Sequence, residues 1–448
     1  MLQSDDLGFE TTLLDNPGVL SLQPWLTLIP SCELQQVFSA GFLIDLNDLL
    51  TEQQKYPHSA GMNIDTNENL TEERWQRVLD FSRTKETPMQ VILSDVIEEK
   101  YKELQKHLPF AHIYYAVKAN PNPQVLSLLA RLGSNFDVAS VYELRRLLEL
   151  GVSADRLSCG NTIKKFDHIK EFYQAGIRLF VTDSELDLRN IAMAAPGSKV
   201  MVRLMAEGGL TADWPLSRKF GCSPDLAGDL LVLARKLGLE PYGLSFHVGS
   251  QQRDITAWDT ALSKVSYLFS WLKENEDLEL KCINMGGGFP AVYQERTHSI
   301  DVYAKEIVRY LQEDYGDDLP EIIIEPGRSL VGDSGVLVSE IVLISRKSRT
   351  ALERWVYQDC GKFGGLMETL GEAIKYPIVC ERTGPAEKVV LAGPSCDSMD
   401  TMYEDYMYEL PLSLAVGDRL YWLSTGAYTS SYSAIEFNGF PPLQTFVL

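Results

Sequence analysis

Lys118 is the residue whose setting points most directly to chemistry. It ends the apolar, β-type run Tyr114–Val117, and a helix-forming segment follows it. Burial at such a strand end would favour the neutral amine, which is the nucleophile of Schiff-base chemistry. An isolated lysine in this setting is more often a solvated residue just past a strand. The functional interpretation therefore depends on what the rest of the chain places around it.

Other polar residues and glycines also follow apolar runs. They are Asp137 with Ser140, Gly160 with Asn161, Arg203, His247, the run Gly286–Gly288, and Glu325 with Arg328. Taken singly, His247 could be a buried core histidine and the glycines a flexible turn. The glycines could instead let backbone N–H groups approach a phosphate. Asp183 and Ser184 are predicted only to cap the helix that follows them.

These residues follow strands that alternate with helices. The predicted strands are 113–117, 135–139, 156–159, 179–182, 200–204, 243–248, 282–285 and 322–325. Continuous apolar strands are typical of a parallel sheet covered on both faces, and eight such units favour a (β/α)8 barrel. Functional residues of these barrels lie at the carboxyl ends of the strands, which is where the polar residues occur.

Three domains are expected. Residues 1–87 form an N-terminal extension that is partly helical, with Thr71 capping a helix that begins at Glu72. Residues 88–335 form the barrel. Residues 336–448 form a β-rich domain, because strand-like runs there are separated by turns and helical periodicity nearly disappears.

Composition narrows the classes of partner. The chain has 448 residues and a formal net charge of -21, so nucleic acid and anionic membranes are poor partners. Seven cysteines lie without paired spacing, so neither a disulfide framework nor a metal site is expected. No stretch has the length of a membrane span, and a cytoplasmic location is expected.

Together the motifs resemble the alanine-racemase-like, fold-type III pyridoxal-phosphate enzymes, especially their ornithine and diaminopimelate decarboxylase branch. The resemblance covers about residues 89–440. It rests on Tyr115–Asn120, Phe136–Ser140, His247–Ser250, Gly286–Gly288, Glu325–Arg328, Gly393–Asp397 and Gly426–Thr429. In this order and spacing the set is highly specific.

The resemblance implies a role for each residue. Lys118 would hold pyridoxal phosphate as a Schiff base, and Glu325 would keep the pyridine nitrogen protonated. His247 would stack on the ring, and Cys396 would return a proton to the α-carbon after carbon dioxide leaves. The implied phosphate ligands are Ser250, Gly287, Gly288, Arg328 and Tyr428. Arg203, Asp137 and Glu143 match charged positions beside the lysine and Glu325.

The substrate implied is a basic diamino acid. Asp397 follows Cys396 where diaminopimelate enzymes carry glutamate, and Asp359 matches a second carboxylate. Two carboxylates suit a terminal ammonium, which favours L-ornithine (giving putrescine) or L-lysine (giving cadaverine). Tyr428 and Phe437 are placed in the same substrate pocket. The other reading of Asp397 is a turn residue.

Two chains are expected to share each site, because the resemblance brings the β-domain of one subunit against the barrel of the other. Lys219 and Asp400 match an intersubunit ion pair. Other functions stay open: decarboxylation of diaminopimelate, arginine or a conjugated or carrier-bound amino acid, and a regulator without catalysis. A racemase is disfavoured by Cys396 and Asp397.

Overall fold

Eight parallel strands close into a barrel in the computed structural model, which describes residues 70–206, 211–214 and 219–448. The strands are β2 (Ala111–Ala116), β3 (Asn135–Val138), β4 (Leu157–Cys159), β5 (Leu179–Thr182), β6 (Lys199–Arg203), β8 (Glu240–Ser245), β10 (Cys282–Asn284) and β11 (Glu321–Ile324). All eight overlap the predicted ones, and the ring closes through pairing of β11 with β2. The predicted barrel is confirmed.

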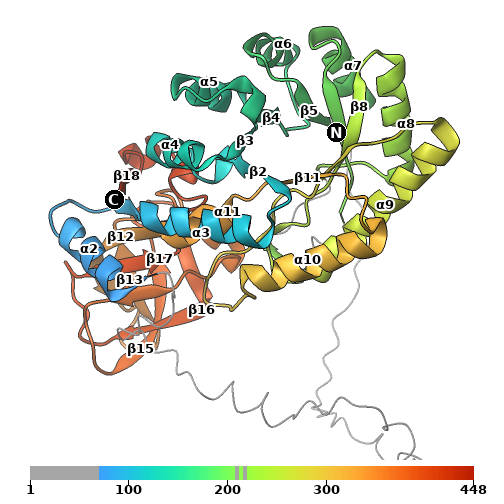
Figure 1. Cartoon of the computed structure of the whole chain (residues 1–448). Helices are drawn as coiled ribbons and strands as arrows, with labels where there is room; N and C mark the ends of the chain where they lie inside the picture. The colour runs from blue at the N-terminus through green and yellow to red at the C-terminus, as the bar shows by residue number, and fades with distance from the viewer. Residues whose placement is uncertain (1–69, 207–210, 215–218) are drawn as a thin grey trace, which may run out of the picture. The chain divides into compact units, whose positions relative to one another are not determined.

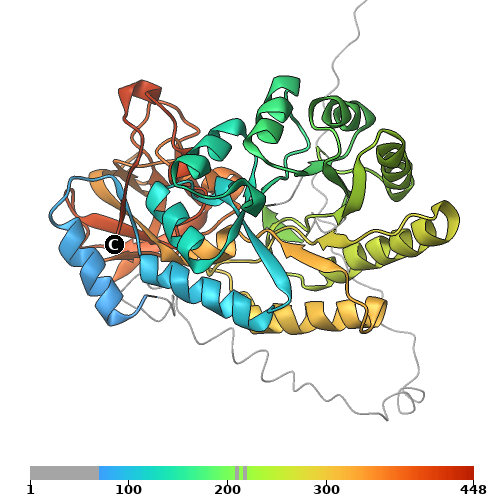
Figure 2. The same cartoon turned by 45° about the horizontal axis from the view of Figure 1, so that its top comes forward.

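Helices before and between the barrel strands cover the barrel from outside (Figure 1). They are α3 (Ser94–His107), α4 (Pro123–Leu132), α5 (Val141–Glu149), α6 (Phe166–Ala175), α7 (Glu185–Ala194), α8 (Pro224–Lys236), α9 (Thr256–Glu276) and α10 (Ile300–Tyr315). Helices α3 and α10 pack side by side although they are far apart in the sequence (Figure 2). Strand residues are buried on both faces, as the near-continuous apolar runs require.

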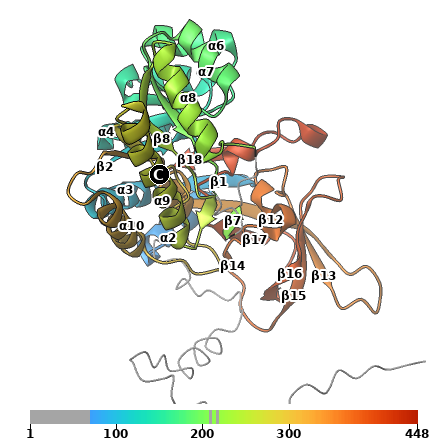
Figure 3. The same ribbon diagram turned by 90° about the vertical axis from the view of Figure 1, so that its right-hand side faces the viewer.

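A mixed second sheet follows the barrel, in the order β14-β17-β12-β13-β15-β16. Its strands are β12 (Gly335–Ser345), β13 (Arg354–Gln358), β14 (Ile378–Cys380), β15 (Ala386–Ala392), β16 (Thr401–Pro411) and β17 (Arg419–Leu423). In Figure 3 strands β13, β15 and β16 stand apart from the green helices α6 to α8 of the barrel. The predicted β-rich domain is confirmed. The strand-like runs in the sequence, 335–343, 355–358, 389–391 and 419–422, correspond to β12, β13, β15 and β17, so β14, β16 and the last strand, β18 (Gln444–Val447), were missed.

Strand β1 (Met89–Ile92) departs from the expected domain boundary. It pairs antiparallel with β12 and parallel with β18 (Gln444–Val447), so it lies in the second sheet rather than in the barrel. Its four residues are all buried. The barrel path therefore starts at α3, and the sheet takes strands from both ends of the described chain.

Helix α2 (Glu72–Ser82) begins as predicted, because the Thr71 side chain accepts a hydrogen bond from the Arg74 N–H. Trp75 of this helix packs edge-on against Tyr421 of β17, with ring centroids 4.9 Å apart. The rest of the predicted extension, residues 1–69, lies outside the described residues. Among those described, no helix combines the length and the apolar composition needed to cross a bilayer.

Candidate functional site

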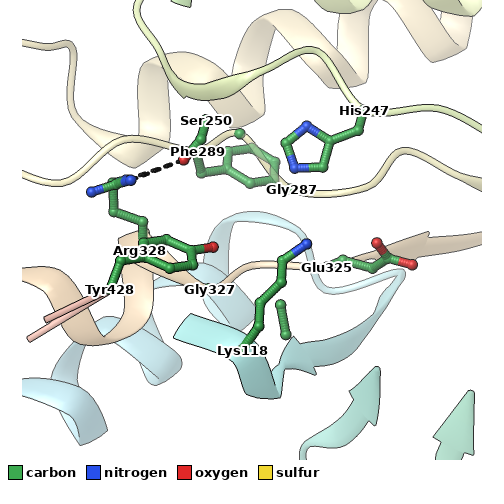
Figure 4. A pocket seen from close by; sticks show the side chains of 11 residues that line it. Lys118, His247, Ser250, Gly287, Phe289, Glu325, Gly327, Arg328 and Tyr428 are labelled. Carbon is green, nitrogen blue, oxygen red and sulfur yellow. Dashed lines mark hydrogen bonds between the residues drawn. The ribbon is translucent and has the colours of Figure 1, made fainter. Parts of the chain in front are cut away.

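One pocket collects most of the residues that the motifs single out (Figure 4). It is lined by Ala116, Lys118, His247, Ser250, Gly287, Gly288, Phe289, Glu325, Gly327, Arg328 and Tyr428. Apart from Tyr428, which comes after β17, these residues follow β2, β8, β10 and β11 or end β2. The polar residues therefore gather at the carboxyl end of the barrel, as expected.

Lys118 lies in a short 3-10 turn, Val117–Ala119, directly after β2. The segment after β17 stabilises this turn, because the Tyr428 N–H donates to the Ala119 carbonyl at 2.8 Å. The Asn120 side chain also donates to the Gly426 carbonyl at 2.8 Å. The lysine side chain itself is exposed, so the burial inferred from the apolar run is wrong. The flanking residues Val117 and Ala119 are buried, and the turn directs the lysine away from them.

Glu325 lies beside Lys118 in Figure 4, on the side of the pocket away from Arg328 and Tyr428. The Asn284 side chain donates to its Oε1 at 2.5 Å, and Asn284 Oδ1 accepts from the Gly286 N–H at 2.9 Å. Asn284 thus fixes both the carboxylate and the start of the glycine run. Sequence reasoning missed it, although it ends β10 two residues before Gly286.

A second carboxyl group, Asp137 at the end of β3, is buried near Glu325. Burial and the negative charge of Glu325 raise the pKa of Asp137 well above its usual range, against the opposing charge of Lys118. The Ser158 hydroxyl donates to it at 2.9 Å. Burial lowers the pKa of Arg203, whereas Glu325, Asp183 and Asp137 act in the opposite direction. The guanidinium therefore lies in the field of three acidic groups.

The His247 ring enters the pocket from the segment after β8. Its Nδ1 accepts a hydrogen bond from the Gly249 N–H at 3.1 Å, which places the ring proton on Nε2. Burial, followed by the positive charges of Lys118 and Arg203, holds the pKa of His247 well below its usual range. The imidazole is therefore neutral near pH 7.

The far end of the pocket holds a buried arginine and several neutral donors. Arg328 donates to the Ser250 hydroxyl oxygen, and Figure 4 shows the Tyr428 ring beside it. The Arg328 guanidinium carbon lies 4.8 Å from the centre of that ring. Burial raises the pKa of Tyr428 to about 12, so its hydroxyl stays protonated and can donate.

Close backbone packing requires the glycines at this end. Gly288 has φ +103°, and a Cβ on it would lie 2.7 Å from the Gly249 carbonyl oxygen. A Cβ on Gly287 would lie 2.6 Å from the Glu325 carbonyl oxygen. The run is therefore more than a flexible turn, because each added methyl group would meet another rim segment.

Besides Asp137, Glu143 and Arg203, four predicted site residues do not line this pocket: Cys396, Asp397, Asp359 and Phe437. Cys396 and Asp397 are exposed. Asp397 Oδ1 accepts from the Met399 N–H at 2.9 Å, so it does form a turn. Asp359 Oδ1 accepts from the Glu340 N–H at 2.8 Å, and the Phe437 ring lies 4.3 Å from that of Phe363. One described chain therefore does not bring the predicted proton donor to Lys118.

Three acidic residues have contacts that sequence reasoning did not anticipate. Asp183 makes no helix cap; its Oδ2 accepts from the Gly221 N–H at 2.8 Å. Glu143 closes the start of α5 by accepting from the Ala139 N–H at 2.6 Å. Asp400 is buried and accepts from the backbone N–H groups of Lys362 and Ser395. The expected ion pair between Asp400 and Lys219 of two chains stays a prediction.

Comparison with known proteins adds an independent observation. The family model described as "Pyridoxal-dependent decarboxylase, pyridoxal binding domain" matches residues 94–332. A lysine/ornithine decarboxylase of Selenomonas ruminantium is 35% identical over 356 residues, covering 79% of this chain and 88% of that protein. Decarboxylase flvG of Aspergillus flavus is 30% identical over 77% of this chain and 81% of its own length.

Solved structures agree with the sequence comparison. The lysine/ornithine decarboxylase of Vibrio vulnificus, solved in complex with cadaverine, superposes with a TM-score of 0.76 at 28% identity. The alignment covers 84% of this chain and 99% of that one. The likeness thus spans both the barrel and the second sheet.

Proposed function

The chain belongs to the pyridoxal-dependent decarboxylases, and from that premise we propose that it decarboxylates L-ornithine, L-lysine or both, with Lys118 as the cofactor lysine. Pyridoxal-phosphate-dependent decarboxylation of a basic amino acid is shown by the family and its relatives. The choice of substrate and the residue roles are the proposal. The observation that carries it is the convergence of Lys118, His247, Glu325 and Arg328 on one pocket.

The residues present fit pyridoxal phosphate. In Figure 4 the amine of Lys118 points toward the His247 ring, with Glu325 on one side and Tyr428 and Arg328 on the other, so a cofactor ring could lie between them. At the far end Ser250, Tyr428 and the backbone of Gly287 and Gly288 offer neutral donors suited to a phosphate. When bound, the cofactor supplies an electron sink for the pair released by the leaving carboxylate.

Each pocket residue then has a task that its geometry supports. Glu325, oriented by Asn284, would hold a proton at the pyridine nitrogen of a bound cofactor. Neutral His247 would cover the ring face and exclude water without adding a competing positive charge. The exposed Lys118 amine can reach an incoming carbonyl directly.

Proton return and recognition of the substrate's distal end are assigned to Cys396 and Asp397. Both side chains are exposed, so they are available to a second chain. We therefore propose a homodimer in which the second sheet of one subunit completes the pocket of the other, with an isologous interface and two sites. Asp359 supports this assignment less well, because the Glu340 amide already binds its carboxylate. Tyr428 and Phe437 are the remaining proposed substrate contacts, and a cytoplasmic location stays a prediction.

A substrate panel tests the proposal. Release of carbon dioxide from ornithine, lysine, arginine and diaminopimelate should be fastest with ornithine or lysine. These two should differ modestly, because one methylene changes binding by about 1–3 kcal/mol. If all four are inert while pyridoxal phosphate binds, a conjugated amino acid becomes the favoured substrate. If the cofactor does not bind, the enzyme assignment of this pocket fails.

A further inference from the structure

Gln251 has a backbone conformation that is rare for its residue type. Its φ is +56°, in the left-handed region that favours glycine and asparagine. The residue is 1% exposed and lies in the short strand β9 (Ser250–Gln252). An unfavourable backbone conformation persists only where surrounding contacts offset it, and such positions are frequent at functional sites. The side chain of Gln251 should therefore make contacts that hold this conformation.

Both polar atoms of the Gln251 side chain bind one residue, Ala291. Nε2 donates to the Ala291 carbonyl at 2.8 Å, and Oε1 accepts from the Ala291 N–H at 2.9 Å. Both residues are buried, so water does not compete for these hydrogen bonds. A carboxylate could make only the second bond and an apolar side chain neither of them. The contact therefore requires the amide group and fixes its orientation.

The segment that Gln251 binds is itself anchored. The N–H of Val292, the residue after Ala291, donates to Asp333 Oδ1 at 2.8 Å. Lys100 of α3 forms an ion pair with the other oxygen of this buried carboxylate, at 3.2 Å. Asp333 lies just before β12, so both α3 and the start of the second sheet hold the segment. Gln251 thus binds a fixed point of the fold.

Gln251 connects two segments that offer donors to a phosphate. Ser250 precedes it in the chain, and Gly288 lies three residues before Ala291. One backbone hydrogen bond runs beside the side-chain contact, from the Gln252 N–H to the Gly288 carbonyl at 2.9 Å. Gln251 is not among the residues that line the pocket, so it acts on the pocket only through the position of its neighbours.

We propose that Gln251 is a positioning residue that sets the distance between Ser250 and the glycine run, and with it the affinity for the cofactor phosphate. Donors on two segments bind one phosphate well only if their spacing matches it. A contact that fixes this spacing in advance removes the entropy cost of ordering the segments on binding. In the left-handed conformation Ser250 lines the pocket while the next side chain reaches Ala291. The inference rests on the proposed phosphate end of the pocket.

Gln251→Met tests the contact, because methionine has a similar length but makes neither hydrogen bond. The readout is the ratio of two dissociation constants, that of pyridoxal over that of pyridoxal phosphate, from titration of the cofactor-depleted full chain. The constant for pyridoxal phosphate should rise about tenfold or more, since two buried hydrogen bonds are lost. Pyridoxal has no phosphate, so its constant should change by less than about threefold. The ratio should therefore fall, whereas a residue that only stabilises the fold would leave it unchanged.

Two further variants separate the contact from backbone strain and from general stability. Gln251→Asn tolerates the positive φ, but its side chain is one methylene shorter and cannot reach both groups of Ala291. Its ratio should fall as in Gln251→Met. Gln358→Met is the matched control, because Gln358 of β13 is equally buried and accepts from the Trp422 indole N–H at 3.0 Å. It should lower the melting temperature and leave the ratio unchanged.

Each other outcome contradicts a stated part of the argument. An unchanged ratio in Gln251→Met overturns the inference and leaves the proposed function intact. A ratio that falls in Gln251→Met but not in Gln251→Asn would assign the effect to backbone conformation, and an equal fall in Gln358→Met would assign it to stability. If Gln251→Met does not fold, Gln251→Asn decides, and loss of the fold in both would make the contact structural. Failure of the wild type to bind pyridoxal phosphate would instead refute the proposed function.

Discussion

Lys118 is the primary amine among the described residues that line the pocket. Lys118→Ala should therefore abolish both the yellow colour of the bound cofactor and the decarboxylase activity. The measurements are the visible absorbance, which borohydride should bleach in the wild type, and carbon dioxide release. Colourless wild-type protein that pyridoxal phosphate cannot reconstitute would contradict the assignment.

His247 makes stability depend on pH in a predictable direction. Its pKa is lowered in the folded chain, whereas in the unfolded chain it titrates near the ordinary value of about 6.5. Below that pH the unfolded state binds more protons. The stabilisation is therefore complete above about pH 6.5 and is lost as the pH falls toward the folded pKa.

Urea unfolding at pH 7.5 and 5.5 measures this effect. The wild type should lose about 1 kcal/mol more free energy of unfolding between the two values than His247→Gln does. Carboxylates titrate in both proteins, so they cancel in the comparison. Equal losses would mean that His247 is protonated in the folded protein.

Asp397 has two candidate roles, the turn that it forms and the predicted contact with the substrate ammonium. Asp397→Ala should raise KM for a diamino acid about tenfold or more while leaving cofactor affinity unchanged, because an ammonium loses its partner. Asp397→Asn is the matched control, since its Oδ1 can still accept from the Met399 N–H. If only the alanine variant is impaired, the residue serves the turn and not the substrate.

Lys118, His247 and Glu325 were singled out because each belongs to a short motif at a strand end. The structure brings all three to one pocket, and their roles stay predictions. Glu368 and Tyr293 were missed because neither belongs to a motif; only folding brings them to Arg328. Asp183 was misassigned because its partner, Gly221, lies across a loop.

At the scale of elements, the glycine run Gly286–Gly288 packs closely against the segment after β8 and the segment after β11. Gly288→Ala should destabilise the protein by about 1–2 kcal/mol or more, since φ +103° is unfavourable for alanine and its Cβ would meet Gly249. Urea unfolding and cofactor titration should both register the change. The control is Gly228→Ala in α8, where the nearest atom would be 3.6 Å from the Cβ. Alanine there should be neutral or stabilising by up to about 1 kcal/mol. Equal effects of the two variants would refute the steric account.

The barrel strands were predictable because each is an apolar run between helices. Strand β16 was missed because Glu404 and Asp405 interrupt its apolar pattern and are exposed. Strand β1 falls within residues 88–335, which were expected to form the barrel, but it pairs in the second sheet. Its partners Val338 and Gln444 lie far along the chain, and local pattern carries no information about such distant pairing.

At the scale of the whole molecule, the position of the proposed proton donor decides the assembly. Lys118 lines the pocket and Cys396 does not, so inactive Lys118→Ala and Cys396→Ala chains should complement each other when mixed. Random exchange in a symmetric dimer should restore up to about a quarter of the sites. Each variant alone should stay near background in the carbon dioxide assay.

The control for this experiment is demonstrated subunit exchange, for example between chains that carry different affinity tags. Exchange without recovery of activity would mean that each site is built within one chain. Recovery well above a quarter would contradict two independent sites per dimer.

The pairing of β1 with β12 and β18 has a consequence for synthesis. On the ribosome β1 emerges before the entire barrel, yet the strands that flank it, including Gln444–Val447, are made only after the barrel. The nascent chain must therefore carry an unpaired apolar strand through translation, in reach of other chains or of chaperones. We expect slow synthesis and high expression levels to favour aggregation at this segment. We also expect that a chain cut between the barrel and the second sheet leaves the second sheet without its strand β1.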